Sequence, residues 1–382
     1  MNRLELLVMY FCTGLTLCVL YATQPIGPVF EVELGISRTE ATLFTTSMMT
    51  PLAFASIFYG YILERVAIKK LLILAFLLLG VSEIIFSLSS SYFWMLNIRG
   101  FQGLLVPAVL TGIMSYISTA STKENVASAI GAYIGVTIIG GFLGRFFSGF
   151  FTDLFGWRVF FIMVGILLLL AAFLVFKFSS SISASFIKPK LKDIIHILKI
   201  KHNLYIYMMI FGIFFSFQAI LNFIPFELTN LGNEYSGSKT GMMYFGYVLG
   251  VLISFNLKKI VAVFRTAQNA IIFGIIVFLI ALQIFRFESF LVMFVAMLVF
   301  CIGNFIAHSV ASGFINKMAE SHKGISNGLY VSFYYAGGAL GSFLPGFIYM
   351  QSGWGAFLTL ITAISSLSLV MILVLKYAKQ SV

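Results

Sequence analysis

Residues 131–160, GAYIGVTIIGGFLGRFFSGFFTDLFGWRVF, and residues 328–357, GLYVSFYYAGGALGSFLPGFIYMQSGWGAF, are two versions of one segment. Aligned without a gap at an offset of 197 residues, they are identical at twelve of thirty positions. Six of the identical residues are glycines, and Trp157 aligns with Trp354. Because the offset is about half of the 382-residue chain, we interpret the chain as two copies of one half-length unit.

The composition indicates that both copies lie in a lipid bilayer. The chain is 60% hydrophobic and 10% charged, with a mean hydropathy of +1.03, whereas soluble domains carry about 25% charged residues. This excludes a water-soluble fold. The net charge of +11 would suggest a nucleic-acid partner in a soluble protein, but basic residues collect in the cytoplasmic loops of membrane proteins. We therefore expect contact with the lipid bilayer and none with nucleic acid.

Twelve apolar stretches are long enough to cross a bilayer, which takes about 20 helical residues. They are residues 5–30, 40–62, 70–89, 93–117, 126–150, 157–178, 203–226, 238–257, 267–286, 290–315, 325–350 and 355–376. The longest polar interruption, 179–202, is rich in Ser and Lys and has a short amphipathic pattern at 191–200. These features predict an all-α integral membrane protein with twelve transmembrane helices in two pseudo-symmetric six-helix bundles, 1–178 and 203–382, joined by a cytoplasmic linker.

The charge of the loops predicts the orientation of the chain in the membrane. Basic residues dominate the loops after the second and eighth spans, the linker and the C-terminal tail. On the opposite side acidic residues are in excess, as with Glu31, Glu33 and Glu40 against Arg38 after the first span. Both termini are therefore expected in the cytoplasm.

The sequence carries no recognisable catalytic or cofactor-binding pattern. Cys12, Cys18 and Cys301 lie in apolar stretches without a CxxC pair, so we expect no disulfide, zinc site or iron–sulfur site. There is no phosphate-binding glycine loop followed by Lys-Ser or Lys-Thr, and no nucleophile–base motif. We expect no enzymatic activity, no metal and no cofactor.

Residues 60–70, GYILERVAIKK, resemble the signature loop of the major facilitator superfamily, glycine-x-x-x-acid-arginine-x-glycine-x-basic-basic. Ala67 replaces the usual second glycine, and a glutamate replaces the usual aspartate. The resemblance implies a latch at the cytoplasmic face, where an exposed ion pair worth about 1 kcal/mol is easily exchanged; the alternative is an ordinary basic loop. The latch residues are Gly60, Glu64, Arg65, Lys69 and Lys70.

Two further motifs support the resemblance. Residues 99–103, RGFQG, are similar to the arginine-x-x-glutamine-glycine motif of the superfamily, and 131–160 resembles the glycine-rich fifth helix of its exporters, although Val136 stands where a proline is usual. Residues 334–346, YYAGGALGSFLPG, resemble a bacterial branch associated with drug or sugar efflux. Glycines allow membrane helices to approach closely. We expect such packing at Gly131, Gly135, Gly140, Gly141, Gly144, Gly337, Gly338 and Gly341.

The resemblance implies a monomeric transporter in the bacterial cytoplasmic (inner) membrane, driven by the proton gradient. We expect secondary active transport by alternating access, with the substrate site between the two bundles, and most simply proton-coupled export of a small organic compound. One alternative is a proton symporter or uniporter that imports a small anionic or polar metabolite, since two arginines and one glutamate lie within spans. Another is a non-transporting membrane sensor.

Charges within membrane spans are the strongest functional candidates, because each is costly unless paired or hydrated. Glu83, Arg99 and Arg145 fall in the outer halves of the third, fourth and fifth spans. Burial favours a protonated carboxyl group and a nearby arginine favours the carboxylate. We therefore predict that Glu83 exchanges protons under the influence of both arginines; the alternative is a static ion pair. His308 is a second candidate proton site, or a hydrogen-bonded structural histidine.

Polar and aromatic residues near the middle of the membrane are candidates for contact with the substrate. The first, fourth, seventh and tenth spans line the cavity in the superfamily that the chain resembles. For each residue the alternative is an interhelical hydrogen bond. The candidates are Tyr21, Gln24, Gln102, Gln218, Asn222, Asn304, Tyr334 and Tyr335.

Overall fold

The computed structural model describes residues 3–122, 125–178, 191–232, 236–318 and 323–378. In these ranges the regular structure is entirely helical. The first half contains α1 (Arg3–Tyr21), α2 (Gly27–Leu34), α3 (Arg38–Arg65), α4 (Ile68–Leu88), α5 (Tyr92–Ala120), α6 (Val126–Phe155) and α7 (Trp157–Phe176). The second half contains α8 (Leu191–Lys199), α9 (Lys201–Gly232), α10 (Gly237–Met242), η1 (Met243–Phe245), α11 (Gly246–Phe255), α12 (Leu257–Val263), α13 (Ala267–Ile284), α14 (Phe290–Met318), α15 (Lys323–Phe343) and α16 (Pro345–Ala378).

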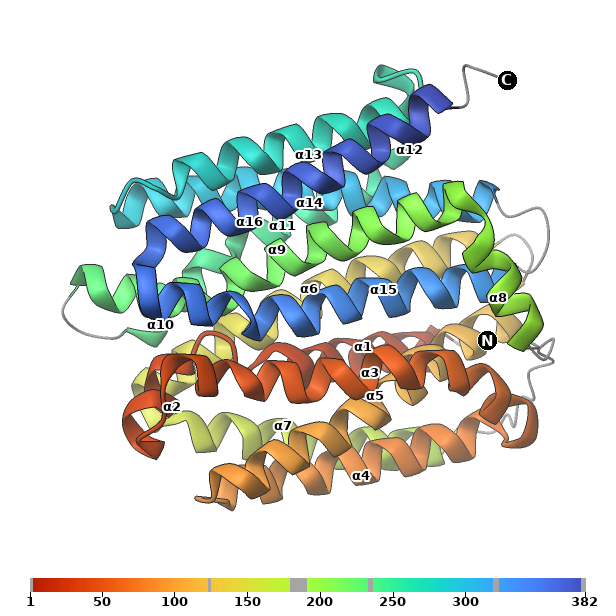
Figure 1. Cartoon of the computed structure of the whole chain (residues 1–382). Helices are drawn as coiled ribbons and strands as arrows, with labels where there is room; N and C mark the ends of the chain where they lie inside the picture. The colour runs from red at the N-terminus through yellow and green to blue at the C-terminus, as the bar shows by residue number, and fades with distance from the viewer. Residues whose placement is uncertain (1–2, 123–124, 179–190, 233–235, 319–322, 379–382) are drawn as a thin grey trace.

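The helices form two layers that follow the two halves of the sequence (Figure 1). Helices α1 to α5 and α7 lie on one side and α9, α11, α13, α14 and α16 on the other, while α6 is drawn behind α9 and α15. Contacts between the layers are made mainly by α3 with α15 and by α6 with α10 and α11. The beginning of α1, the end of α16 and α8 lie at one end of the molecule, and α2 and α10 lie at the other. We call the end opposite α8 the outer end.

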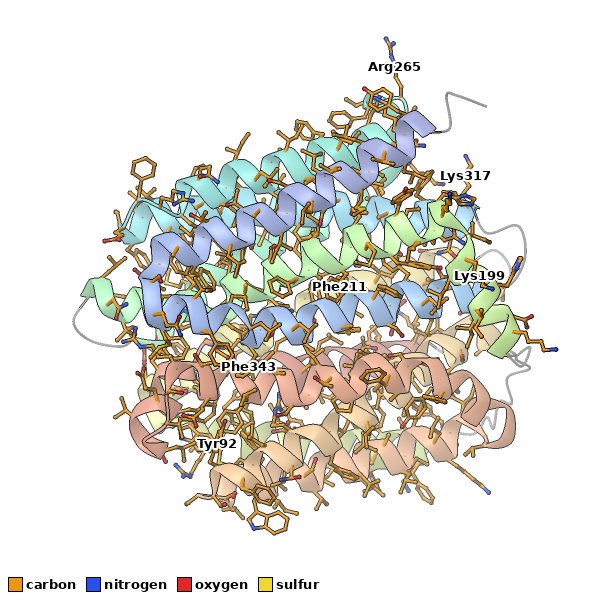
Figure 2. All side chains as sticks on the ribbon, viewed as in Figure 1. Tyr92, Lys199, Phe211, Arg265, Lys317 and Phe343 are labelled. Carbon is orange, nitrogen blue, oxygen red and sulfur yellow. The ribbon has the colours of Figure 1, made fainter. Side chains whose placement is uncertain are left out.

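The described helices are sufficient for twelve membrane crossings. Nine are long and apolar enough to span a bilayer, and the pair Gly237–Phe255 and Leu257–Val263, bent by 76°, raises the number to ten. Helices α3 and α15, with 28 and 21 residues, are less apolar and pack against each other between the bundles. Large apolar side chains cover the outside of both layers (Figure 2). The predicted all-α membrane fold is confirmed.

Several predicted boundaries were wrong because Pro and Gly interrupt the helices. The expected first span, 5–30, is broken at a turn over 22–26, after which Pro28 lies in the first turn of α2. The expected eleventh span is broken at Leu344, just before Pro345. The short helix predicted at 191–200 is confirmed as α8, whereas residues 179–190 of the linker lie outside the described residues.

The sequence repeat appears as a repeated turn. Gly156, between α6 and α7, has φ +81° and ψ 151°. Gly353, its equivalent at the offset of 197, has φ +74° and ψ −175° and marks a kink inside α16. This conformation is essentially confined to glycine. Each half therefore reverses direction before its last span with the same glycine, followed by the same tryptophan.

The close helix crossings are repeated as well. A Cβ atom added to Gly140 would lie 2.7 Å from the oxygen of Gly14, and one added to Gly144 would lie 2.5 Å from the Cα atom of Cys18. In the second half the equivalent glycines, Gly337 and Gly341, meet the backbone of Phe211 and Phe215. These partners are also separated by 197 residues. The offset therefore relates both members of each helix pair, α1–α6 and α9–α15.

The remaining predicted packing glycines differ in their surroundings. A Cβ atom on Gly135 would lie 3.0 Å from the ring of Phe255, and one on Gly338 would lie 2.6 Å from the ring of Phe214. Gly131 was wrongly predicted to pack closely, because a Cβ atom there would have no neighbour within 4 Å among the described residues.

Only part of the predicted cytoplasmic latch can be placed. The side chains of residues 60–65, which include Gly60, Glu64 and Arg65, lie outside the described part of the chain. Lys69 donates a hydrogen bond to the carbonyl oxygen of Phe178, at the end of the sixth span, and Lys70 is exposed. The latch therefore stays a prediction.

Candidate functional site

Glu83 of α4 and Arg99 of α5 form an ion pair inside the first bundle. Both side chains are completely buried, with 3.5 Å between Glu83 Oε1 and Arg99 Nη1. Gly165 of α7 allows this arrangement, because a Cβ atom there would lie 3.3 Å from the Cβ atom of Glu83. Arg99 also donates hydrogen bonds to oxygens of Val19, Leu20, Phe44 and Gln102.

Arg99 and Glu83 differ in how many hydrogen bonds they form with the rest of the protein. Arg99 has four oxygen acceptors besides the carboxylate, three of them backbone carbonyls. Neither oxygen of Glu83 accepts a hydrogen bond from a described residue. Gln102, a candidate for substrate contact, instead joins this cluster, accepting from Arg99 and donating to Ser82. The arginine can remain solvated by protein oxygens whether or not Glu83 is charged.

Arg145 of α6 does not join the Glu83 pair, which corrects the prediction that both arginines act on that carboxyl group. Its Nε atom donates to Gln24 Oε1 at 2.6 Å, and its Nη1 atom donates to the carbonyl oxygen of Gly141 at 2.7 Å. A Cβ atom on Gly141 would lie 3.3 Å from both Arg145 Nη1 and the ring of Tyr21. The glycine therefore leaves space for the buried guanidinium group.

Tyrosine rings surround Arg145 from both bundles. The Cζ atom lies 3.9 Å from the ring centroid of Tyr21 in α1, 4.7 Å from that of Tyr247 in α11 and 5.3 Å from that of Tyr244 in η1. Cation–π contacts of this kind stabilise a desolvated guanidinium group. Tyr244 and Tyr247 were not predicted from the sequence. Their spacing of three within the eighth span was the available signal, but it does not reveal that they face another bundle.

A chain of hydrogen bonds leads from Arg145 across the bundle interface. Gln24 donates from Nε2 to Gln218 Oε1 of α9 at 2.6 Å. Asn222 donates to the backbone oxygen of Gln218 and to Ser342 Oγ of α15. Three predicted polar candidates, Gln24, Gln218 and Asn222, are thus brought together. We call Arg145, Gln24 and Gln218 the interface triad.

The interface triad contains two buried donors that lack a partner among the described residues. These are Arg145 Nη2 and Gln218 Nε2. The Oε1 atom of Gln218 already accepts from Gln24 and, at 3.5 Å, from Asn222, so its Nε2 atom is the donor left over. Unsatisfied buried donors are costly, by about 1–3 kcal/mol each. Their position marks where an acceptor group would be stabilised.

The remaining predicted residues, His308, Asn304, Tyr334 and Tyr335, belong to the second bundle. His308 shares a hydrogen bond of 3.0 Å between Nδ1 and the hydroxyl of Tyr330, and its ring lies 4.5 Å from that of Tyr334. The side chains of Tyr335 and Tyr21 are hydrogen-bonded to each other. Asn304 is buried, and its amide group has no hydrogen-bond partner among the described residues. Within the described ranges, no cluster of three His, Cys, Asp or Glu side chains could hold a metal ion.

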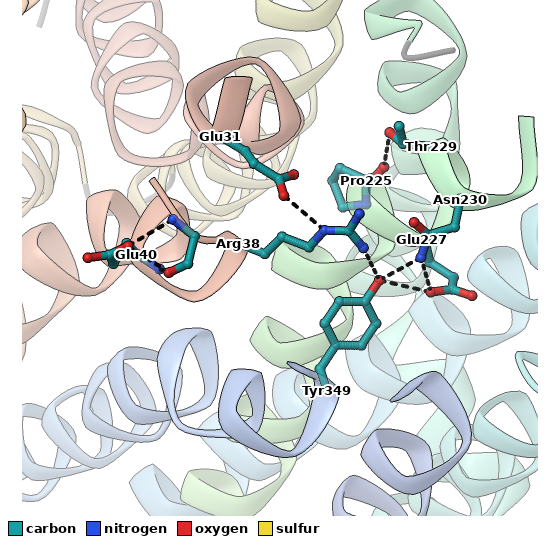
Figure 3. Close-up of polar contacts among 9 residues, drawn as sticks. Glu31, Arg38, Glu40, Pro225, Glu227, Thr229, Asn230 and Tyr349 are labelled. Carbon is teal, nitrogen blue, oxygen red and sulfur yellow. Dashed lines mark hydrogen bonds and ion pairs between the residues drawn. The ribbon is translucent and has the colours of Figure 1, made fainter. Parts of the chain in front are cut away.

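Two polar contacts join the bundles at the outer end. Figure 3 shows the first, in which Arg38 donates from Nε to Glu31 at 3.1 Å and from Nη1 to the hydroxyl of Tyr349 at 3.1 Å. Tyr349 in turn donates to Glu227 at 2.9 Å. In the second contact, Asp153 of α6 accepts from the backbone N–H groups of Gly237 and Ser238 at 2.7 and 2.8 Å. We call these the outer clasps.

Glycines allow the second outer clasp to close. A Cβ atom on Gly149 would lie 2.9 Å from the carbonyl carbon of Gly237, and one on Gly237 would lie 2.8 Å from that of Gly149. The backbones of α6 and α10 are therefore in direct contact. The two bundles are held together at the outer end, above the interface triad.

Comparison with known proteins agrees with this architecture. The sequence profile of the Major Facilitator Superfamily matches residues 9–269. The chain is 28% identical to inner membrane transport protein YnfM of Escherichia coli, over 94% of this chain and 88% of the relative. It is 21% identical to quinolone resistance protein NorA of Staphylococcus aureus, over 91% of this chain and 90% of the relative.

Solved structures show the same fold at low sequence identity. A mutant of the nucleoside transporter NupG superposes with a TM-score of 0.80 at 12% identity, covering 97% of this chain and 99% of that one. At this identity the likeness concerns the arrangement of the helices alone.

Proposed function

The chain belongs to the Major Facilitator Superfamily and is a membrane transporter, and on this premise we propose that it exports a small organic compound in exchange for protons. The observation that carries the proposal is the separation of two buried charged groups. Glu83 and Arg99 pair inside one bundle, whereas Arg145 lies at the interface between bundles. The first group suits proton exchange and the second suits substrate recognition.

Proton exchange at Glu83 is supported by the unequal hydrogen bonding of Glu83 and Arg99. When Glu83 is ionised, Arg99 neutralises it at 3.5 Å. When Glu83 is protonated, Arg99 keeps its four oxygen acceptors and is not left as an unpaired buried cation. Both protonation states are therefore compatible with a folded bundle, as a proton carrier requires.

The end of α1 connects the two charged groups. Arg99 donates to the carbonyl oxygens of Val19 and Leu20, and Arg145 contacts Tyr21 and Gln24 in the next turn. The helix ends at this point. Loss of charge on Glu83 frees Arg99 to bind these carbonyl oxygens more strongly, which displaces the segment that also holds Arg145. Under the proposed mechanism this couples protonation to the substrate site.

The same proposal places the chain as a monomer in a bacterial inner membrane with both termini in the cytoplasm. The similarity to an inner membrane transport protein of Escherichia coli supports the location. Figure 2 supports the orientation, because Lys199, Arg265 and Lys317 gather at the end where α1 begins and α16 finishes. Basic residues favour the cytoplasmic side.

Growth of pump-deficient bacteria tests export directly. Cells expressing the wild-type chain or Glu83→Gln at equal levels are exposed to cationic, neutral and anionic toxic compounds. Protection by the wild type that the variant lacks supports export with Glu83 as the coupling residue. Increased sensitivity to an anionic compound supports the second candidate, proton-coupled import, which is favoured by Arg145, a cation without a carboxylate partner among the described residues. Protection that is equal in both strains contradicts the role of Glu83.

A further inference from the structure

Arg145 is a fully buried cation without a carboxylate partner in the described part of the chain. The described buried ion pair belongs to Glu83 and Arg99, and the other described ion pairs, Arg38–Glu31 and Arg158–Glu33, are at least partly exposed. Removing a cation from water costs several kcal/mol unless an opposite charge or sufficient hydrogen bonds replace the water. Two hydrogen bonds that Arg145 donates and three tyrosine rings replace it only in part, since Arg145 Nη2 has no partner among the described residues.

The unsatisfied groups of the interface triad are both donors. Arg145 Nη2 and Gln218 Nε2 lie on either side of Gln24, whose amide group bonds to both residues. A ligand group that only accepts hydrogen bonds would satisfy both donors. A group that carries a single negative charge would also neutralise Arg145, whereas a doubly charged phosphate would leave a buried negative charge in excess. A carboxylate meets both conditions and binds an arginine with two parallel hydrogen bonds.

We infer that the interface triad recognises the carboxylate of a small organic monoanion with a planar, largely apolar body, an inference that rests on the proposed transport function. The carboxylate takes the place of Gln24 on Arg145 and accepts from Gln218. The aromatic rings of Tyr21 and Tyr247, which lie beside Arg145, then face the apolar body. Since the Gln24–Gln218 hydrogen bond joins the two bundles, its displacement loosens their contact, and substrate binding thereby favours rearrangement of the bundles.

The test measures binding to the purified full-length chain in detergent. The probes are benzoate and cinnamate, each matched with its uncharged amide, benzamide or cinnamamide. Thermal unfolding is followed as a function of probe concentration for the wild type, Arg145→Gln, Arg145→Lys and Gln218→Ala, with the exposed Arg286→Gln as a matched control. We expect stabilisation by a carboxylate but not by its amide, and an affinity reduced about 10- to 100-fold in Arg145→Gln.

The two other variants separate charge from geometry. Arg145→Lys keeps the charge but loses the bidentate fork, so its affinity should lie between those of the wild type and Arg145→Gln. Gln218→Ala removes the second donor and should weaken carboxylate binding without creating affinity for the amide. Arg286→Gln should bind as the wild type does.

Transport measurements distinguish this inference from the proposed function. Proteoliposomes carrying a pH gradient are assayed for uptake of radiolabelled benzoate. Carboxylate binding that depends on Arg145, without any gradient-driven flux, supports the substrate class and contradicts proton-coupled transport. The inference is overturned if the amides bind as tightly as the acids, if Arg145→Gln binds benzoate with wild-type affinity, or if neither carboxylate stabilises the chain.

Discussion

Replacing Arg99 should lower the free energy of unfolding more than replacing Glu83, although both substitutions remove the same ion pair. At 3.5 Å the two charges attract each other by about 5 kcal/mol with an effective dielectric constant of about 20. In Glu83→Gln, Arg99 keeps four oxygen acceptors. In Arg99→Gln, Glu83 would remain buried without a hydrogen bond from a described residue.

The magnitude of the difference follows from these partners. Breaking a buried pair so that one charge is left uncompensated costs about 3–5 kcal/mol, which we expect for Arg99→Gln. For Glu83→Gln we expect about 1–2 kcal/mol, because a cation that retains hydrogen bonds loses only part of its stabilisation. The double variant should be less destabilised than the sum of the two, since the remaining charge is removed.

Thermal unfolding in detergent measures the first part of this prediction, and transport in proteoliposomes measures the second. Glu83→Gln should lose accumulation driven by a pH gradient while retaining exchange of labelled for unlabelled substrate across the membrane. An Arg99→Gln variant that is no less stable than Glu83→Gln would refute the assignment of unequal partners. Gradient-driven accumulation by Glu83→Gln at the wild-type level would refute the coupling role.

Three further predictions concern the packing that surrounds the site. Gly353→Ala should lower the free energy of unfolding by about 1–3 kcal/mol, measured by thermal unfolding, because alanine is strained at φ +74°. Gly144→Val should abolish the native helix crossing with α1, visible as a loss of folded protein in size-exclusion chromatography, whereas Gly131→Val should not. Asp153→Asn should weaken an outer clasp and increase the labelling of a cysteine introduced at Ser236 by a membrane-impermeant reagent; unchanged labelling would contradict this.

The fold could be predicted from the sequence because its causes are local. The length of each apolar stretch determines how many times the chain can cross the bilayer, and the repeat at an offset of 197 determines how the halves are related. The glycines of the repeat determine where helices approach. Helix ends were less predictable. Pro345 interrupts the backbone inside a stretch whose composition is continuously apolar, so this interruption leaves no signal in hydropathy.

The candidate site could be predicted only in part. Glu83 and Arg99 are near the facing ends of consecutive antiparallel helices, so their depth in the membrane already brings them close. Arg145 has a similar depth, but its direction depends on the rotation of α6, which is determined by close packing against α1. Tyr244 and Tyr247 could not be assigned at all, because their contact with Arg145 depends on how one bundle docks on the other.

Arg145 does not share the carboxylate of Glu83 with Arg99, and this separation has a functional consequence. A charge that is neutralised within a bundle can change its protonation state while the bundle stays folded, and its effect reaches the interface through the end of α1. If a carboxylate of the same bundle neutralised a cation at the interface, that cation would no longer be available to bind an anionic ligand. Arg145 is held there by tyrosine rings and amide oxygens, which stabilise a guanidinium group less than a carboxylate would. Burying the Arg145 guanidinium group therefore retains a free-energy cost. An anionic substrate can offset this cost by binding Arg145, and it can do so only while the two bundles enclose the site.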